Sequence, residues 1–337
     1  MSTPSGPTDT APHVVSVSLD PTVLVVRLLP GQVVGDLRAV SHLLAPHMGA
    51  VALRIESRGV GEYAVVTLLD SDPLDVGFPL PVGPVTGVVV LARDEQGSEV
   101  CIDPEHLGHV AVQGATRSGK SAWLYSVLAQ LSERQRAGYP LTIGGIDPSG
   151  ILLRPFSAGN VVLGLSSPAA VESHLVALVA DMDARIGRIP VTSDVLPIND
   201  DDPLRFVVLE EYPGLLRWLD ALDPKTGKRV RALVARLMAE GHKAGIRVVM
   251  VAQRAEANVI GSTERGQASI RVSFRVDSHD AVKLLHPDAD PGTAGIHAGA
   301  LPGVALLSAP GVPLARVRAP WIGSYAEYVR RVTGSHR

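Results

Sequence analysis

The second two thirds of the chain alternate between apolar runs and helical patterns. Beyond about residue 105 the apolar runs are HVAVQ, LTIGGID, NVVLGL, RFVVLE and IRVVMVA. Strands that are apolar throughout are typical of sheets buried on both faces, and strands separated by helices form parallel sheets. Ligands of such sheets bind at the carboxyl ends of the strands. The pattern therefore predicts an α/β domain over residues 105–320, with a parallel sheet flanked by helices.

One helix is marked strongly by its apolar positions. Over residues 227–243 these positions recur at helical spacing and form one stripe, made of Val230, Leu233, Val234, Leu237 and Met238. Such a stripe is typical of a helix that packs against a core. We interpret it as packing and not as a functional feature.

The first hundred residues predict a separate, small α/β domain. Strand-like runs occupy residues 22–30, VALRIES and YAVVTLLD, with a helical pattern of Leu37, Val40 and Leu44 after the first run. A proline- and glycine-rich stretch at 72–87 predicts a long loop or linker. We place the small domain and its linker at 14–104. Residues 1–13 are expected to be disordered, and residues 321–337 to form a C-terminal helix or tail with a frayed, solvated end.

Composition narrows the class of protein. Of the 337 residues, 46% are hydrophobic and 19% are charged, as is ordinary for a soluble globular chain. The single cysteine, Cys101, excludes an intramolecular disulfide and a cysteine-based metal site. No apolar run reaches the length of a membrane span, and the first residues lack the features of a signal peptide. We expect a cytoplasmic protein that a partner could recruit to a membrane.

The net charge of −3 gives no overall basic signature of nucleic-acid binding. This argues against a protein that coats DNA with its whole surface. It leaves open a ring that contacts DNA through a few pore loops.

A phosphate-binding loop is the strongest motif in the chain. The octet GATRSGKS fits G-x-x-x-x-G-K-[ST] and stands between an apolar strand and a helix. Backbone N–H groups from Ala115 to Lys120 are expected to face the phosphates, Lys120 to reach the β and γ oxygens, and Ser121 to ligate Mg²⁺. The predicted cofactors are ATP and Mg²⁺. The predicted nucleotide-binding residues are Gly114, Ala115, Thr116, Arg117, Ser118, Gly119, Lys120 and Ser121.

Two further strand ends carry polar groups suited to phosphoryl transfer. Glu210 and Glu211 end the run RFVVLE and its continuation, and Gln253 ends IRVVMVA. One carboxylate could hold Mg²⁺ while the next orients the attacking water, and the amide could sense the γ-phosphate. A solvated strand end is the alternative interpretation of the two glutamates, and the upstream octet makes it the weaker one.

These motifs together resemble the motor domain of the FtsK/SpoIIIE DNA translocases, in particular the TraB-type branch of plasmid-transfer and integrative-element proteins. The resemblance rests on the histidine five residues before the octet, IDPSG, VVLEEYPGLL, GHKAGIRVVMVAQRAEANVI and IRVSFRV. It implies a RecA-like P-loop NTPase motor that assembles as a homo-hexamer and pumps double-stranded DNA through its pore. By position it implies that Glu210 supports Mg²⁺, that Glu211 activates water and that Gln253 is the sensor.

The resemblance also assigns basic residues and shows departures. Arg254 and Arg265 match DNA-contacting positions, Arg271 matches an arginine near the nucleotide edge, and His242 stands where the family has its trans-acting arginine. Lys243 and Arg271 are further trans-acting candidates. Glu210 replaces the usual aspartate. The winged-helix module and membrane segments of chromosomal members are not found, so a membrane-associated or DNA-processing partner is expected to localise the ring.

Two other classes of function fit parts of this pattern. FtsK-like ATPases of specialised secretion systems share the motor but move polypeptide, and they usually string several motor domains together. A P-loop kinase or regulatory switch would bind nucleotide without translocation. The glutamate pair and the Gln253–Arg254 element favour a motor.

Overall fold

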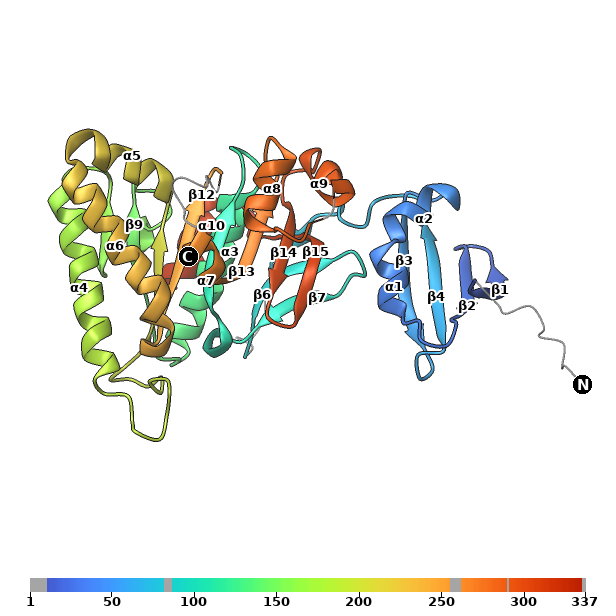
Figure 1. Ribbon diagram of the computed structural model, residues 1–337, viewed down its shortest axis with the longest axis horizontal. Helices are drawn as coiled ribbons and strands as arrows, with labels where there is room; N and C mark the ends of the chain where they lie inside the picture. The colour runs from blue at the N-terminus through green and yellow to red at the C-terminus, as the bar shows by residue number, and fades with distance from the viewer. Residues whose placement is uncertain (1–10, 82–86, 255–261, 290, 335–337) are drawn as a thin grey trace, which may run out of the picture. The chain divides into compact units, whose positions relative to one another are not determined.

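The computed structural model describes residues 11–81, 87–254, 262–289 and 291–334 (Figure 1). The chain divides into two compact units. The first comprises the described part of Met1–Val76 together with Asp94–Ser98, and the second comprises the described part of Gly77–Arg93 and Glu99–Arg337. Most of the expected N-terminal disorder, at residues 1–10, lies outside the described residues, but His13 already begins a strand.

The first unit is an antiparallel sheet with two short helices. Its strand order is β1–β2–β4–β3, made of His13–Ser18, Val23–Arg27, Tyr63–Leu69 and Ala52–Arg58. The helical pattern seen in the sequence forms two helices, α1 (Val34–Ala39) and α2 (Ser41–His47). Their apolar side chains pack on β2, β3 and β4 around Val26, Ile55 and Val66. β1 is exposed along its whole length, and for that reason the hydrophobic pattern did not reveal it.

The second unit is built on a ten-stranded sheet. In spatial order its strands are β10 (Val161–Leu163), β9 (Leu141–Asp147), β11 (Leu204–Leu209), β12 (Ile246–Ala252), β8 (His109–Gln113), β13 (Ala268–Phe274), β14 (Val304–Ala309), β15 (Val312–Arg318), β6 (Val89–Asp94) and β7 (Glu99–Ile102). The strands from β10 to β13 pair in parallel, which confirms the predicted α/β sheet. The antiparallel extension through β14 and β15 was not predicted.

The sheet takes in residues that the sequence analysis grouped with the small domain. β6 and β7 pair with each other, and β6 lies next to β15. Val89 and Leu91 are buried in the core of the second unit. A short pair, β5 (Phe78–Pro79) with β16 (Pro320–Trp321), begins this unit inside the stretch interpreted as a linker. Proline and glycine are common in linkers and in short edge pairings alike, so composition did not separate the two cases.

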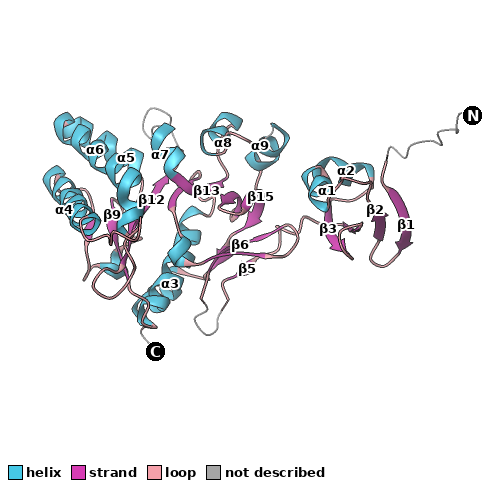
Figure 2. Ribbon diagram, turned by 60° about the horizontal axis from the view of Figure 1, so that its bottom comes forward, coloured by secondary structure: helices cyan, strands magenta, loops and turns pink. Residues whose placement is uncertain are grey.

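Helices cover both faces of the large sheet (Figure 2). α3 (Lys120–Arg136) and α10 (Tyr325–Thr333) lie on one face, and α4 (Pro168–Ile186), α5 (Tyr212–Leu222) and α6 (Pro224–Glu240) lie on the other. The apolar stripe of α6 packs in the core as predicted, with Val230, Val234 and Leu237 fully buried. Among the described helices, none combines the length and the apolar character needed to cross a membrane.

The remaining described helices are short and lie near the ends of strands. They are η1 (Pro104–His106), η2 (Arg154–Phe156), η3 (Gly241–Ala244), α7 (Ser262–Gln267), α8 (His279–Leu285) and α9 (Pro291–Ala298). η3 contains the neighbouring residues His242 and Lys243. Because η3 is a 3₁₀ helix, the side chains of these two residues are rotated by about 120° from each other around the helix axis, compared with about 100° in an α-helix.

The C-terminal helix is docked, which corrects the expectation of a frayed and solvated end. Tyr328 is fully buried, and its hydroxyl donates to the carbonyl of Leu152 at 2.6 Å. The guanidinium of Arg331 forms a two-bond pair with Glu133 of α3, at 2.6 and 2.8 Å. The amphipathic pattern of α10 therefore reflects packing on α3. Residues 335–337 lie outside the described part of the chain.

Candidate nucleotide and catalytic site

The glycine-bounded loop follows β8 and leads into α3, at the carboxyl edge of the parallel strands. Gly119 has φ +111°, and a Cβ atom there would lie 2.6 Å from the backbone nitrogen of Gly303. A Cβ atom on Gly114 would lie 2.6 Å from Cβ of Phe274. Both motif glycines are thus required by packing as well as by the approach of a phosphate.

Some of the loop's N–H groups have partners within the protein. Gly114 donates to the carbonyl of Gln253 at 3.3 Å, Ala115 to that of Arg275 at 2.8 Å, and Ser118 to that of Ala115 at 3.1 Å. The expectation that every N–H from Ala115 onward faces phosphate therefore needs correction at Ala115 and Ser118. The first N–H groups of α3 have no carbonyl one turn earlier in the helix, so Lys120 and Ser121 keep donors suited to an anion.

Lys120 extends from the first turn of α3 to the neighbouring strands. Its Nζ donates to the carbonyl of Ala252 at 2.9 Å and lies 3.8 Å from Oε2 of Glu211. Burial lowers the pKa of this ammonium, and the carboxylates of Glu211 and Glu210 oppose that effect. The structure thus brings together the loop lysine, the end of β12 and the second glutamate, which lie far apart in the sequence.

Glu211 has an unusual backbone. Its φ and ψ are +45° and +46°, in the left-handed region, and it is the N-cap of α5. A non-glycine residue in this region costs roughly 1–3 kcal/mol, and such residues cluster at functional sites. The turn places the side chain of Glu211 on the P-loop side of the strand end, within ion-pair distance of Lys120.

Burial strongly perturbs the ionisation of Glu210, which directly follows β11. Burial raises its pKa to about 7, the negative charges of Asp147 and Glu211 act in the same direction, and Lys120 opposes them. At neutral pH its carboxyl group is therefore poised between the protonated and ionised forms. This property follows from the environment at the sheet edge and was not evident from the sequence.

Asp147, the last residue of β9, is a site residue that sequence reasoning missed. It is fully buried, and its carboxylate accepts hydrogen bonds from the N–H groups of Ser149, Gly150 and Leu153 and from the hydroxyl of Ser149. These donors hold a charge beside Glu210. The signal was present in IDPSG, in which an aspartate ends an apolar strand just as the glutamates do.

The residues proposed for Mg²⁺ offer hard oxygen ligands. Ser121 is exposed at the start of α3, and Glu210 directly follows β11. A hydroxyl and a carboxylate suit Mg²⁺, which binds few protein ligands together with substrate phosphates. Within the described residues, no group of three or more histidine, cysteine, aspartate or glutamate side chains is arranged to hold a metal ion. The donor set is compatible with a metal bound jointly with a nucleotide.

A cavity of about 530 Å³ opens beside the phosphate-binding loop. It brings together Glu211 and Gln253, as the sequence analysis expected, and adds Arg254. Its lining consists of Ala115, Thr116, Glu211, Pro213, Arg217, Gln253, Arg254, Val276 and Asp277. Arg217 and Arg254 thus lie near the proposed reacting groups. The other DNA-contact candidate, Arg265, stands in α7, after residues 255–261, which lie outside the described part of the chain.

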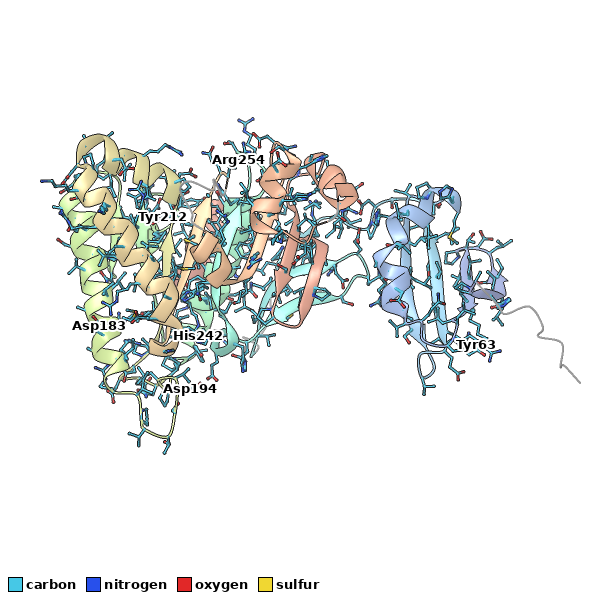
Figure 3. The ribbon with its side chains drawn as sticks, viewed as in Figure 1. Tyr63, Asp183, Asp194, Tyr212, His242 and Arg254 are labelled. Carbon is cyan, nitrogen blue, oxygen red and sulfur yellow. The ribbon has the colours of Figure 1, made fainter. Side chains whose placement is uncertain are left out.

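The trans-acting candidates lie away from this cavity. His242 and Lys243 are exposed in η3, before the amino end of β12, whereas Arg254 follows its carboxyl end. Figure 3 shows His242 and Arg254 at opposite ends of the strand. Arg271 stands in the middle of β13 and donates to the carbonyls of Ala268 and Leu285.

Arg247, which could have substituted for His242, is held inside the protein. It is 4% exposed and donates to the carbonyls of Leu107, His242, Ile246 and Glu105. Burial lowers its pKa to about 10. The histidine before the octet, His109, is also buried, and its Nδ1 accepts from the N–H of Val248 at 2.9 Å.

Comparisons with known proteins place these features in context. No protein-family model matches the chain. A DNA translocase FtsK of Campylobacter jejuni is 24% identical over 205 residues, covering 58% of this chain and 21% of that protein. One of Staphylococcus aureus is 23% identical over 301 residues, covering 79% of this chain and 36% of that protein. The chain therefore spans only about a fifth to a third of these relatives.

Solved structures show the same fold. The conjugation coupling protein TcpA of pCW3, in a monomer form with ATPγS, matches with a TM-score of 0.62 at 16% identity, over 95% of this chain and 93% of that one. The type VII secretion ATPase EccC of Thermomonospora curvata matches with a TM-score of 0.57 at 19% identity, over 79% of this chain and 33% of that one. The predicted P-loop motor fold and the resemblance to FtsK/SpoIIIE motors are confirmed.

Proposed function

We propose that this chain, an FtsK/SpoIIIE-type motor by its motifs and fold, is an ATP-driven translocase of double-stranded DNA that acts as a homo-hexameric ring. We assign it to plasmid or mobile-element transfer, in the manner of the TraB-type branch. Its cofactors are ATP and Mg²⁺. It works in the cytoplasm, and a membrane-associated or DNA-processing partner recruits it to its site of action.

One observation carries the enzymatic part of this proposal. Lys120, Glu211 and Gln253 come from three separate segments and meet around one phosphate-binding loop, with 3.8 Å between the lysine and the glutamate. A lysine that binds phosphate beside a carboxylate that can polarise water is the arrangement that ATP hydrolysis requires. A glycine-rich turn of purely structural purpose would not need this convergence.

We assign the residue roles from the motifs and the resemblance, and the proximity of Lys120, Glu211 and Gln253 supports three of them. Residues Gly114–Ser121 hold the nucleotide, Glu211 orients the attacking water, and Gln253 senses the γ-phosphate. Ser121 and Glu210 support the metal ion, which when bound neutralises charge on the phosphates. In the proposed ring, Arg265 contacts the duplex backbone, and the exposed residues His242 and Lys243 lie on a surface available to a neighbouring subunit.

The DNA substrate is supported by the relatives. The curated proteins that the chain matches are described as DNA translocases, and TcpA is described as a conjugation coupling protein. TcpA also matches nearly the whole of both chains, so the small unit and the motor unit occur together in a protein of that description.

Export of polypeptide is the second candidate. The secretion ATPases EccC and EssC match the chain with TM-scores of 0.57 and 0.56. The chain covers only 33% and 52% of those structures, whereas it covers nearly all of TcpA. A nucleotide switch without transport is the third candidate, and the position of Glu211 beside Lys120 disfavours it because a switch does not need rapid hydrolysis.

The deciding experiment measures the rate of ATP hydrolysis with and without duplex DNA, on protein whose oligomeric state is determined in the same buffer. A DNA translocase should hydrolyse faster on duplex DNA and should form a ring under those conditions. A rate of hydrolysis that duplex DNA leaves unchanged but an unfolded polypeptide raises would support the export function. Binding of ATP without turnover, with or without DNA, would support the switch.

A further inference from the structure

Arg217 and Arg254 line the cavity that adjoins the phosphate-binding loop. The resemblance assigns no role to Arg217, and it assigns Arg254 to DNA. In the structure both share a cavity wall with Ala115 and Thr116 of the loop and with Glu211. Their position raises the question of which anion these two guanidinium groups bind.

The side chain of Arg217 lies along the first turn of α5, beside the catalytic glutamate. The point that a Cβ atom of Gly214 would occupy is 3.9 Å from Nη2 of Arg217 and 3.8 Å from Oε1 of Glu211. The guanidinium and the carboxylate therefore approach the same point beside Gly214, which lies only 3.0 Å from Cγ of Glu211 and has no room for a further atom. Helical side chains tilt toward the helix N-terminus, which directs Arg217 toward the loop.

Arg254 approaches the same cavity from the end of β12. Its Nη1 lies 3.9 Å from Oδ1 of Asp277, and its Nη2 lies 3.5 Å from Oγ of Ser278. Both distances are long, and the carboxylate is 73% exposed. Exposed pairs of this kind contribute only about 0–1 kcal/mol, so a phosphate could replace this partner at low cost.

The chemistry favours the terminal phosphate of a nucleotide. Guanidinium groups bind phosphate through paired N–H donors, and such charge-assisted bonds are about twice as strong as neutral ones. Gln253 and Glu211, the groups assigned to the γ-phosphate and its attacking water, line the same cavity. If those assignments hold, the γ-phosphate, which a diphosphate lacks, is the group that would meet the two guanidinium groups.

We infer that Arg217 and Arg254 are γ-phosphate contacts supplied by the same subunit, which make the site prefer a nucleoside triphosphate to a diphosphate. This inference rests on the proposed nucleotide-binding function. It also provides positive charge near the γ-phosphate in a chain that has His242 at the position of the trans-acting arginine.

Fluorescent ADP and a fluorescent non-hydrolysable ATP analogue, each with Mg²⁺, test the inference by titration of the full chain. Arg217→Ala and Arg254→Ala should each weaken binding of the ATP analogue by about tenfold or more. Each should change the affinity for ADP by less than about twofold. Arg217→Lys should restore part of the lost affinity for the ATP analogue, because lysine keeps the positive charge but lacks the paired N–H donors of the guanidinium group. Arg236→Ala is the matched control, since Arg236 is an exposed arginine on α6 that pairs with Asp183 of α4.

Three results would overturn the inference. One is an equal loss of ADP and analogue affinity in Arg217→Ala and in the milder Arg217→Gln. Another is an unchanged preference for the analogue in both alanine variants, with duplex binding weakened in Arg254→Ala, which would return Arg254 to a DNA role. Failure of the unsubstituted protein to bind either nucleotide would instead refute the proposed function, and this inference would fall with it.

Discussion

Nζ of Lys120 lies 3.8 Å from Oε2 of Glu211, although ninety-one positions separate the two residues in the chain. The contact joins the charge that binds phosphate to the carboxylate that can polarise water. The carboxylate also partly offsets the fall in the lysine pKa that burial causes.

The two residues of this pair should fail in different ways when they are replaced. Lys120→Ala removes the cation that reaches the phosphates and should abolish nucleotide binding. Glu211→Gln keeps the shape of the side chain but loses the charge, so it should bind ATP and hydrolyse it at least about a hundredfold more slowly. Equilibrium binding of a fluorescent ATP analogue and steady-state hydrolysis measure the two effects, and an equal loss of binding in both variants would contradict the roles assigned.

Glu210 should make stability depend on pH. The folded protein keeps this proton up to pH about 7, whereas a free glutamate releases it near 4.5. The resulting stabilisation is fully present below the unfolded pKa and is lost as pH rises through about 7. Glu210→Gln removes the buried charge, so at pH 8 it should be more stable than the unsubstituted protein by about 2–3 kcal/mol.

Thermal unfolding at pH 8 and pH 5 checks this expectation. At pH 5 the difference in melting temperature should be much smaller than at pH 8, because Glu210 is protonated in the folded state and only the unfolded chain is ionised. A stabilisation by Glu210→Gln that is equal at both pH values would show that the burial of charge is not the cause.

Gly214→Ala should separate catalysis from stability. The new Cβ atom would lie 3.0 Å from Cγ of Glu211, which is closer than normal contact, so the carboxylate must shift. Alanine is also the better helix former, by about 1 kcal/mol. We expect hydrolysis to fall about tenfold with unchanged or raised thermal stability. Unimpaired hydrolysis would show that the position of this carboxylate is less critical than the strained backbone suggests.

His242 should contribute little to hydrolysis. The residue as a whole is exposed, but partial burial of its imidazole ring and the positive charge of Arg247 lower the pKa of the ring. The ring is therefore mainly neutral at pH 7 and lacks the permanent charge of an arginine. His242→Ala should cost less than about tenfold in DNA-stimulated turnover, far below the loss of an arginine finger. His242→Arg should raise that turnover. An inactive His242→Ala protein that still forms rings and binds ATP would identify the imidazole as the trans-acting group.

The C-terminal helix should contribute measurably to stability. Tyr328→Phe deletes a fully buried hydroxyl and leaves the carbonyl of Leu152 without its donor, at a cost of about 1–2 kcal/mol. Tyr325→Phe is the matched control, because Tyr325 donates to the carbonyl of Ile151 at an exposed position. Thermal melts of the two variants should differ by a few degrees, and equal melts would mean that burial of the Tyr328 bond is unimportant.

The parts of the fold that hydrophobic pattern determines could be predicted from the sequence. The strands β8, β9, β11 and β12 are continuous apolar runs, because helices cover both of their faces. β1 has no buried residue, and Pro313 and Arg316 interrupt the apolar positions of β15. β14 is a nearly continuous apolar run, but its antiparallel pairing with β13, about thirty residues earlier, is not recorded in any local pattern.

The same distinction applies to the candidate site: residues in local motifs could be predicted, and residues whose role depends on the fold could not. Local motifs predict the octet and the strand-end residues Glu211 and Gln253, and the structure brings these residues together. Arg217 and Gly214 were missed because their importance depends on where α5 points, and Asp147 because its effect is exerted across two strands on Glu210. Arg254 was found, but only the fold shows that it lines the cavity beside the loop.

The central position of β12 has a mechanical consequence. All seven of its residues are buried between β11 and β8, and the strand is about 20 Å long. Gln253 and Arg254 follow one end, and the clamped guanidinium of Arg247 lies at the other. A strand that is packed on both faces and paired on both edges is held in register by its neighbours. β12 therefore acts as a fixed spacer, which keeps the surface that carries His242 and Lys243 one strand length away from the cavity.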